Sequence, residues 1–171
     1  MLFNFLNSKP LYLLVVLSPL LASNAYSANS FSTFDVRVID GDTIEVLPKN
    51  KRSERIRLLG IDAPESSQAY GQHSKQSLQQ CINNKEVTIE WNQRDRYSRM
   101  IGKVLAEGVD CNLQQVKNGM AWHYKYYANQ QSVNDRKTYS SSEKTAQRKK
   151  LGLWADPNPI NPYHYRKSNR R

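Results

Sequence analysis

Short stretches in which apolar and polar residues alternate run through the first two thirds of the chain. They occupy residues 36–38, 43–46, 55–61, 87–91 and 101–105. A period of two predicts β-strands that bury one face. The tripeptide Asp40-Gly41-Asp42 separates the first two stretches, and Asp-Gly is a strong turn signal between β-prone runs. The pattern therefore predicts five short strands, with a turn between the first two.

Helical spacing occurs in three further segments. Apolar residues recur at spacings of three and four in Ser74–Ile82. A short helix is predicted after Asn112, a candidate N-cap, and ends at Asn118-Gly119. Asp135–Lys150 is strongly charged and is predicted to be a surface helix. The order of three strands, helix, two strands and two helices predicts an α+β fold with a small closed or partly closed barrel, which can bind oligonucleotides on one face.

The first 28 residues do not fit this domain. Leu11–Ala22 is almost continuously apolar, which is short for a membrane span but suits the core of a signal peptide. Small residues follow at positions 23, 25, 27 and 28 and supply cleavage sites. We predict that residues 1–28 are a signal peptide and that the protein is secreted or periplasmic. The alternative is an uncleaved membrane anchor.

The other end of the chain has a different composition. Residues 156–171 contain three prolines and a basic finish, and we predict an irregular basic C-terminal tail. The folded domain is then expected to span residues 29–155. The 171 residues carry 25 Lys and Arg against 15 Asp and Glu, a formal net charge of +10. That excess favours a polyanionic partner, either a nucleic acid or an anionic membrane surface.

The chain has two cysteines, too few for a disulfide-dense miniprotein or a four-thiolate zinc site. Because an exported chain folds in an oxidising compartment, we predict a disulfide between Cys81 and Cys111. The loop that it would close, of about 30 residues, is worth roughly 3–4 kcal/mol in the chain-entropy account. Two separate buried thiols are the alternative.

Three polar segments hold the candidate chemistry. Asp40-Gly41-Asp42-Thr43 offers carboxylates for a hard divalent cation, and Asp62-Ala63-Pro64-Glu65 offers two more. Arg57 lies in an otherwise apolar strand and needs an anionic partner, from the protein or from a substrate. The charged loop Arg94–Arg99 supplies guanidinium groups that can grip a phosphate at two points. Metal ligands, a spare carboxylate and arginines together suit phosphodiester cleavage.

Several sequence motifs resemble the staphylococcal-nuclease (thermonuclease) family. They are Val38-Ile39-Asp40-Gly41-Asp42-Thr43, Ile56-Arg57-Leu58-Leu59-Gly60-Ile61-Asp62-Ala63-Pro64-Glu65, Asp95-Arg96-Tyr97-Ser98-Arg99 and Gly119-Met120-Ala121-Trp122. They occur in the order of that family and at its approximate spacing, over about residues 34–154. The resemblance implies a five-stranded OB-type β-barrel with three appended helices that hydrolyses DNA and RNA with one Ca²⁺.

The resemblance also implies a role for individual residues. The positions that match the metal site are Asp42, Asp62 and, through its backbone carbonyl, Ala63. Glu65 matches the proposed general base, and Arg57 and Arg99 match the two arginines that grip the phosphate. The aromatic positions that match the nucleotide pocket are Tyr97 and, without a choice among the last three, Tyr124, Tyr126 and Tyr127.

The sequence thus predicts a monomeric, exported, calcium-dependent endonuclease that acts on DNA and RNA, has no stable protein partner and meets the membrane only during export. One alternative is an OB-type nucleic-acid binder without catalysis. A second is a structural or interaction protein of the cell envelope, held by an uncleaved leader. A zinc enzyme is disfavoured because His73, His123 and His164 are scattered, and each is expected at the surface.

Overall fold

A computed structural model describes residues 29–48 and 52–169 of the chain. The signal peptide predicted for residues 1–28 lies outside the described residues, as does the anchor that was its alternative. None of the helices in the described ranges combines the length and the hydropathy that crossing a bilayer requires.

The strands form one large mixed sheet and one small pair. The described strands are β1 (Asn29–Thr33), β2 (Val36–Val38), β3 (Thr43–Val46), β4 (Glu54–Leu58), β5 (Ile61–Asp62), β6 (Val87–Arg94), β7 (Met100–Ala106), β8 (Val109–Asp110) and β9 (Trp122–His123). The large sheet has the order β1-β6-β7-β4-β3-β2, with β8 beside β7, while β5 pairs with β9. Strands β4 and β7 are parallel, and the other described pairs are antiparallel.

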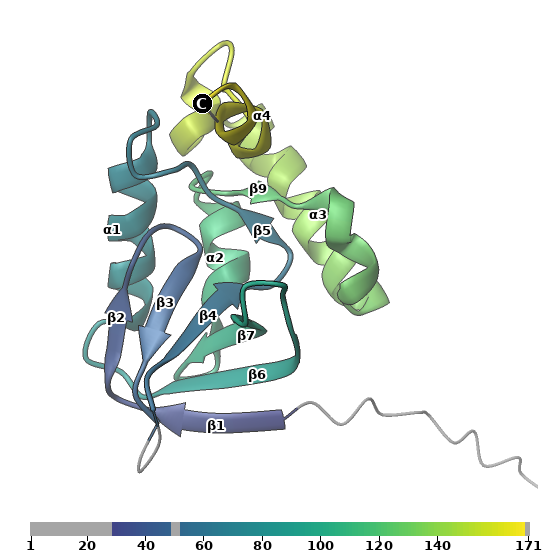
Figure 1. Cartoon of the computed structure of the whole chain (residues 1–171). Helices are drawn as coiled ribbons and strands as arrows, with labels where there is room; N and C mark the ends of the chain where they lie inside the picture. Colours follow the sequence, from purple (N-terminus) through teal and green to yellow (C-terminus); the bar gives the residue numbers. More distant parts are fainter. Residues whose placement is uncertain (1–28, 49–51, 170–171) are drawn as a thin grey trace, which may run out of the picture.

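The five predicted strands correspond to β2, β3, β4, β6 and β7. The predicted 55–61 strand is divided, because Gly60 takes a left-handed backbone conformation with φ of 77° and the chain leaves the large sheet before β5. The sequence pattern did not predict strand β1, which pairs with β6 and forms one edge of the large sheet. The observed class is α+β, with helices against a strongly curved mixed sheet (Figure 1).

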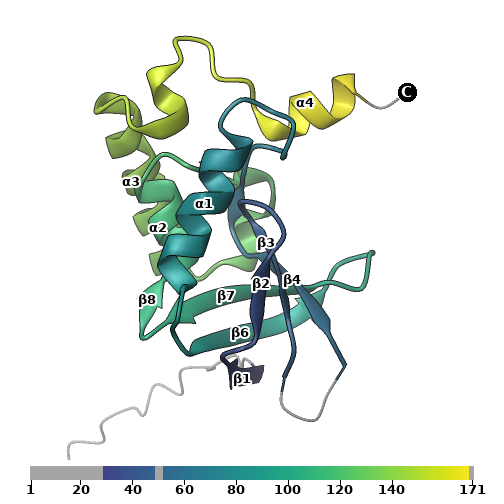
Figure 2. The same ribbon diagram turned by 90° about the vertical axis from the view of Figure 1, so that its left-hand side faces the viewer.

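The described residues contain four α-helices: α1 (Gly71–Ile82), α2 (Cys111–Lys117), α3 (Val133–Arg148) and α4 (Pro162–Ser168). Two short 3-10 helices, η1 (Lys125–Gln130) and η2 (Gly152–Ala155), flank α3. Figure 2 shows α1, α2 and α3 gathered on one side of the molecule, with α4 at the other end of a long connection. The first three match the predicted helices, and α4 is a fourth.

The prediction that residues 156–171 are irregular is wrong for residues 162–168. The side chain of Asn161 accepts a hydrogen bond from the backbone N–H of Tyr163 at 2.9 Å, and Pro162 occupies the first turn of α4. An asparagine N-cap followed by proline is a helix-start signal in its own right. The high content of proline in this segment outweighed that signal in the sequence prediction.

The N-cap predicted for the second helix is also wrong. Asp110 caps α2, because its carboxylate accepts from the backbone N–H of Leu113 at 2.9 Å. Asn112 is fully buried instead. Its side chain donates to the carbonyls of Leu59 and Gly102 and accepts from the N–H of Val104. A buried amide must have its hydrogen bonds satisfied. The Asn112 side chain meets this condition by bonding to β7 and to the backbone that follows β4, and so connects α2 to both strands.

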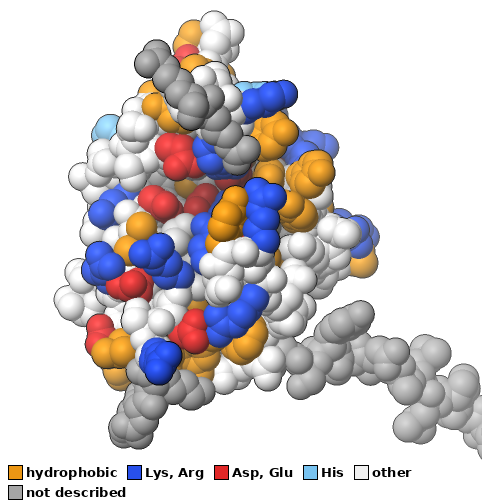
Figure 3. All heavy atoms as spheres, viewed as in Figure 1, with side chains coloured by type: hydrophobic (Ala, Val, Ile, Leu, Met, Phe, Trp, Pro, Cys, Tyr) orange, Lys and Arg blue, Asp and Glu red, His pale blue; other side chains and the backbone are white. Residues whose placement is uncertain are grey.

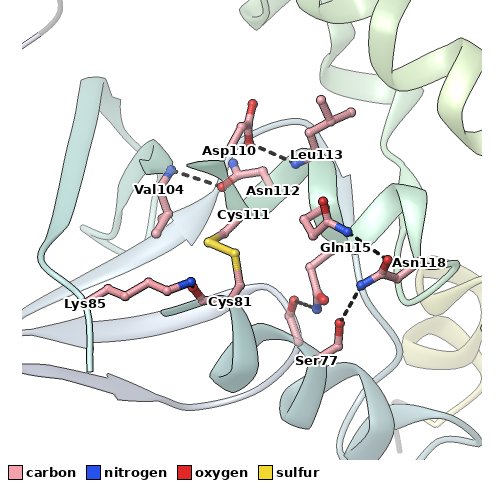
Figure 4. The surroundings of a disulfide bond; sticks show 12 residues. Ser77, Cys81, Lys85, Val104, Asp110, Cys111, Asn112, Leu113, Gln115 and Asn118 are labelled. Atoms are coloured by element: carbon pink, nitrogen blue, oxygen red, sulfur yellow. Dashed lines mark hydrogen bonds between the residues drawn. A yellow bond between two sulfur atoms is a disulfide. The ribbon is translucent and has the colours of Figure 1, made fainter. Parts of the chain in front are cut away.

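A disulfide joins Cys81, near the end of α1, to Cys111, the first residue of α2. The Cα atoms are 5.9 Å apart and the residues are 30 positions apart in sequence. Figure 4 shows the bridge between the two helices, with Asn112 and Gln115 on the adjoining turns of α2. The bridge fixes α1 against α2, and buried apolar residues of both helices belong to the same core as the sheet.

Candidate active site

The turn between β2 and β3 carries the first acidic residues. Gly41 allows this turn to approach its neighbours closely, because a Cβ atom there would lie 1.9 Å from Oγ of Ser74 and 2.7 Å from Cβ of Ala63. The buried amide of Gln115 holds the turn from α2 by donating to the Gly41 carbonyl at 2.8 Å. Asp42 is thereby directed inward, where its Oδ2 accepts from the backbone N–H of Ala63 at 2.6 Å.

Arg57 joins the two aspartates. Its Nη2 lies 3.1 Å from Oδ2 of Asp42 and 3.0 Å from Oδ1 of Asp62, and its Nη1 donates to the carbonyl of Leu58. Asp62 comes from the short strand β5, and its side chain has no exposed surface. The expectation that Arg57 needs an anionic partner is met by two carboxylates of the protein itself.

The buried carboxylates at this site repel one another, and this repulsion changes their pKa values. Burial, and next the charge of Asp42, raise the pKa of Asp62 above its ordinary value. The same two causes raise the pKa of Asp40 to about 6. Buried carboxylates placed this close together favour a bound cation, because ionising both of them without one is costly.

A hard metal ion fits this donor set. The described residues contain no group of three or more His, Cys, Asp or Glu side chains arranged to hold a metal. The candidate ligands are instead two buried carboxylates, on Asp42 and Asp62, together with the backbone at Ala63. A site made only of oxygen donors suits Ca²⁺ better than zinc or copper. The zinc alternative gains no support here, since His123 is buried and hydrogen-bonded to Gln131, contrary to its expected place at the surface.

Glu65 lies on the loop that follows Pro64, close to the aspartates. Its side chain is partly exposed, at 36%, and contacts Arg166 of α4 at 2.8 Å. Arg166 also donates to both carboxylate oxygens of Asp62, at 3.1 Å and 3.0 Å. Although burial opposes it, hydrogen bonding to Asp62 and then to Glu65 raises the pKa of Arg166.

Arg99 and Tyr97 lie in the turn between β6 and β7. The guanidinium of Arg99 is bound by Asp95, with Nε 2.8 Å from Oδ2, and lies 5.6 Å from the centre of the Tyr97 ring. Within the described residues, Arg99 forms no ion pair with Asp42, Asp62 or Glu65. Parallel pairing of Arg57 with Ile101 brings the start of β7 beside Arg57, so the turn adjoins the cluster without contacting the acids.

The three remaining candidate tyrosines form one aromatic cluster. The rings of Tyr124 and Tyr127 are 5.4 Å apart, and those of Tyr126 and Tyr127 are 4.9 Å apart. Tyr124 is the member next to the acids: its N–H donates to the Gly60 carbonyl. Burial, and next the charge of Asp62, raise the pKa of Tyr124. Tyr126 is largely exposed, at 79%. The structure thus distinguishes residues that the sequence left equivalent.

The surface around these residues is hollowed and of mixed charge. Figure 3 shows acidic side chains gathered in a hollow of this face, bordered by Lys and Arg and by apolar side chains. A different hollow, between β2 and α1, is lined by Phe34, Val38 and Ile82 together with amides and two cationic side chains. Its lining contains no carboxylate to balance the charge of a divalent cation, and its two cationic side chains oppose one.

The sequence prediction missed the residues that hold α4 at the site. They are Arg166, which contacts Asp62 and Glu65; Tyr165, which contacts Ser67; and Gln68, which donates to the Ile160 carbonyl. The capping signal at Asn161-Pro162 predicts the helix, as described above. No signal in the sequence pairs Arg166 with Asp62, because 104 residues separate them.

The chain is similar in sequence to known nucleases. Residues 55–156 match the family model described as staphylococcal nuclease homologue. The chain belongs to this family. An uncharacterized endonuclease of Haemophilus influenzae is 41% identical over 135 residues, which cover 79% of this chain and 72% of that protein. A micrococcal nuclease of Shigella flexneri is 40% identical over 144 residues, which cover 79% of this chain and 80% of that protein.

The resemblance found in the sequence motifs is therefore confirmed. Within this staphylococcal nuclease homologue, Arg57, Asp62, Glu65 and Arg99 lie inside the matched residues 55–156. Arg166 lies beyond them. The contact between α4 and the acids thus joins the matched region to a segment that the family model does not cover.

Proposed function

We propose that this protein is an exported, calcium-dependent endonuclease that hydrolyses phosphodiester bonds of DNA and RNA. The observation that carries the proposal is the pair of buried carboxylates, on Asp42 and Asp62, bridged by the guanidinium of Arg57. Membership of the staphylococcal nuclease homologue family supports nuclease activity, as do the relatives named endonuclease and micrococcal nuclease. In this proposal the five predicted strands form an OB-type barrel.

Asp42, Asp62 and the backbone carbonyl of Ala63 would hold the metal. When bound, Ca²⁺ supplies a Lewis acid that polarises a phosphate oxygen. Arg57 is already fixed by two carboxylates and a backbone carbonyl, so its guanidinium needs little reorganisation to stabilise charge on the phosphate. The side chain of Arg99 is held by Asp95 at the adjacent turn and supplies the second cation.

Glu65 is the proposed general base. Its carboxylate is partly exposed and adjoins Asp62 through their shared contact with Arg166, so it can reach a water molecule at the edge of the cluster. It accepts a proton as the water oxygen bonds to phosphorus, and the ester oxygen that leaves takes a proton from solvent. A positioned general base contributes about 10²–10⁴-fold to the rate.

The aromatic cluster supports recognition of nucleotides. Tyr124 adjoins Asp62, and Tyr126 and Tyr127 extend the aromatic surface into solvent. Exposed rings of this kind stack on bases of any sequence. Tyr97 is exposed, has the guanidinium groups of Arg96 and Arg99 over its ring, and is proposed as a further contact. The net charge of +10 favours binding to phosphate backbones, which weakens as salt rises. Export is proposed from the apolar leader, and a monomer is proposed as the active form.

The first test is cleavage of single-stranded DNA and of RNA by the purified protein, with Ca²⁺ or with excess chelator. We expect cleavage only with Ca²⁺. Glu65→Gln should lower the rate by about 10²-fold or more. Glu86→Gln, which changes an exposed acid elsewhere, is the matched control and should keep full activity.

Three outcomes would contradict parts of the proposal. Binding of nucleic acid without cleavage under any metal would make the protein a nucleic-acid-binding barrel. Cleavage that persists in excess chelator would keep the nuclease and reject Ca²⁺ as its cofactor. Recovery of uncleaved chain from the membrane fraction of the expressing cell would reject export and favour the anchored alternative.

A further inference from the structure

Arg166 occupies the position between the acids where a cation is needed. Its guanidinium spans three carboxylate oxygens, both of Asp62 and one of Glu65, at 3.1, 3.0 and 2.8 Å. Asp62 has no exposed side-chain surface, and Arg57 already contacts its Oδ1. With Arg166 in place, both oxygens of Asp62 are engaged by guanidinium groups.

We propose that α4 is a built-in latch, in which Arg166 acts as an internal cation that Ca²⁺ must displace before the site can work. The inference rests on the proposed function, because it takes Asp62 as a metal ligand and Glu65 as the base. It goes beyond that function by giving the C-terminal segment a regulatory role: the docked latch blocks the ligand and the base together.

The docking of α4 is specific but shallow. Tyr165 lies with its hydroxyl 3.1 Å from Oγ of Ser67, and Gln68 donates to the Ile160 carbonyl at 2.6 Å. Pro162 is the single buried residue of α4. An element held by polar contacts and little apolar burial opens at low cost in free energy. Figures 1 and 2 both show α4 at the periphery, joined to the rest by the long connection after α3.

The Arg166 side chain can leave without unfolding the domain. It is 34% exposed, and its contacts with Asp62 and Glu65 are polar. A divalent cation competes well for the site, because its two charges satisfy two buried carboxylates where one guanidinium brings a single charge. Closed and open latch are therefore two states of one molecule, and Ca²⁺ favours the open one.

Calcium binding without substrate tests the latch by titration calorimetry. If the closed form outnumbers the open form tenfold, the apparent Kd for Ca²⁺ is raised about tenfold, and Arg166→Ala should lower it by that factor. The Kd of Arg166→Lys should lie between those of the wild type and Arg166→Ala, since one ammonium group cannot span three oxygens. Lys167→Ala is the matched control: it removes the same charge from an exposed neighbour on α4 and should leave Kd within about twofold of the wild type.

A second variant loosens the latch and keeps the arginine. Tyr165→Phe removes the hydroxyl that contacts Ser67 and should also tighten Ca²⁺ binding, by less than Arg166→Ala does. Limited trypsin digestion gives an independent readout. Ca²⁺ should speed cleavage after Arg166 several-fold relative to cleavage after Lys149, at constant ionic strength.

If Arg166→Ala and Lys167→Ala changed the Kd for Ca²⁺ equally, Arg166 would act only through the net charge of α4, and the latch would be overturned. Weaker Ca²⁺ binding by Arg166→Ala would also overturn it, because Arg166 would then support the metal site. Either result leaves calcium-dependent cleavage by the wild type intact. Absence of Ca²⁺ binding in every variant would instead reject the metal of the proposed function, and the latch with it.

Discussion

Asp62 lies directly opposite Trp122 in the two-stranded sheet formed by β5 and β9. This pairing sets the position of a buried acid that neither strand could hold alone, since each has two residues. Strand β9 is in turn fixed from α3: the carboxylate of Glu143 accepts the backbone N–H of His123 at 2.9 Å and also contacts Lys125. Glu143 therefore positions Asp62 through the backbone.

Glu143→Ala should destabilise the protein by about 1–3 kcal/mol, because it leaves a buried N–H of β9 without its partner. The same variant should weaken Ca²⁺ binding through the displaced Asp62. Urea denaturation and calcium titration measure the two effects. Lys144→Ala is the control, since it removes an exposed charge from the next position of α3, and surface substitutions of this kind change stability by less than about 0.5 kcal/mol. Equal losses in both variants would contradict the role given to the backbone contact.

Arg57→Lys should keep the fold and lose activity. Lysine retains the charge between Asp42 and Asp62, but it lacks the planar fork that reaches both carboxylates and the Leu58 carbonyl. We expect a fall in kcat of about 10²-fold or more, as for removal of one pre-positioned charge at a reacting phosphate. Arg55→Lys changes an exposed arginine two residues earlier on β4 and should leave kcat unaltered. The assignment fails if the two variants turn over substrate at the same rate.

Stability without metal should fall as pH rises from about 4 to about 6. Burial, and next the charge of Asp42, raise the pKa of Asp40 from 3.8 to about 6 in the folded protein. The folded state therefore holds a proton that the unfolded chain has already released over this range, and the stability gained from it is lost as pH passes the folded pKa. Asp40→Asn should remove on the order of 2 kcal/mol of this decline.

Denaturation in chelator at pH 4 and pH 6.5 measures this difference. Asparagine can still accept the N–H of Asp42 that Asp40 accepts at 3.0 Å, so the variant should fold. A residual decline is expected in it, since the pKa of Asp62 is raised in the same direction. An identical decline in wild type and variant would remove Asp40 as a cause.

Loss of the disulfide should cost about 3–4 kcal/mol, for a closed loop of about 30 residues. Cys81→Ala with Cys111→Ala tests this by denaturant unfolding, with alanine chosen because Cys111 is fully buried and serine would bury a hydroxyl. Reduction of the wild type with a thiol reagent also opens the bridge and keeps both cysteines. The two routes should give similar midpoints, and an unchanged midpoint in the reduced protein would argue against a stabilising bridge.

Much of the architecture could be predicted because it depends on local pattern. Alternation over 36–46 and 87–105 gives β2, β3, β6 and β7, and the Asp40-Gly41-Asp42 turn falls where predicted. The motifs that carry the family resemblance also bring Arg57, Asp42 and Asp62 together. Local patterns act within a few residues, so a single sequence exposes them directly.

The rest depended on contacts between distant segments. Asn112 has the chemistry of an N-cap, yet its amide is buried against Leu59, Gly102 and Val104. His123 follows the apolar residues Met120-Ala121-Trp122, but a histidine in this run gives no sign of whether its own side chain is buried. Its burial depends on the packing of β9, which places it opposite Ile61 of β5. Such outcomes follow from which polar groups the packed core must satisfy, a condition that no short window of sequence contains.

The sequence by itself determined the α+β class, the acidic turns and the arginine that needs an anionic partner. Only the tertiary structure decided that Arg166, in a segment expected to be irregular, reaches Asp62 across 104 residues. The physical reason is that a buried carboxylate attracts whichever cation the fold can deliver, and delivery depends on the path of the whole chain.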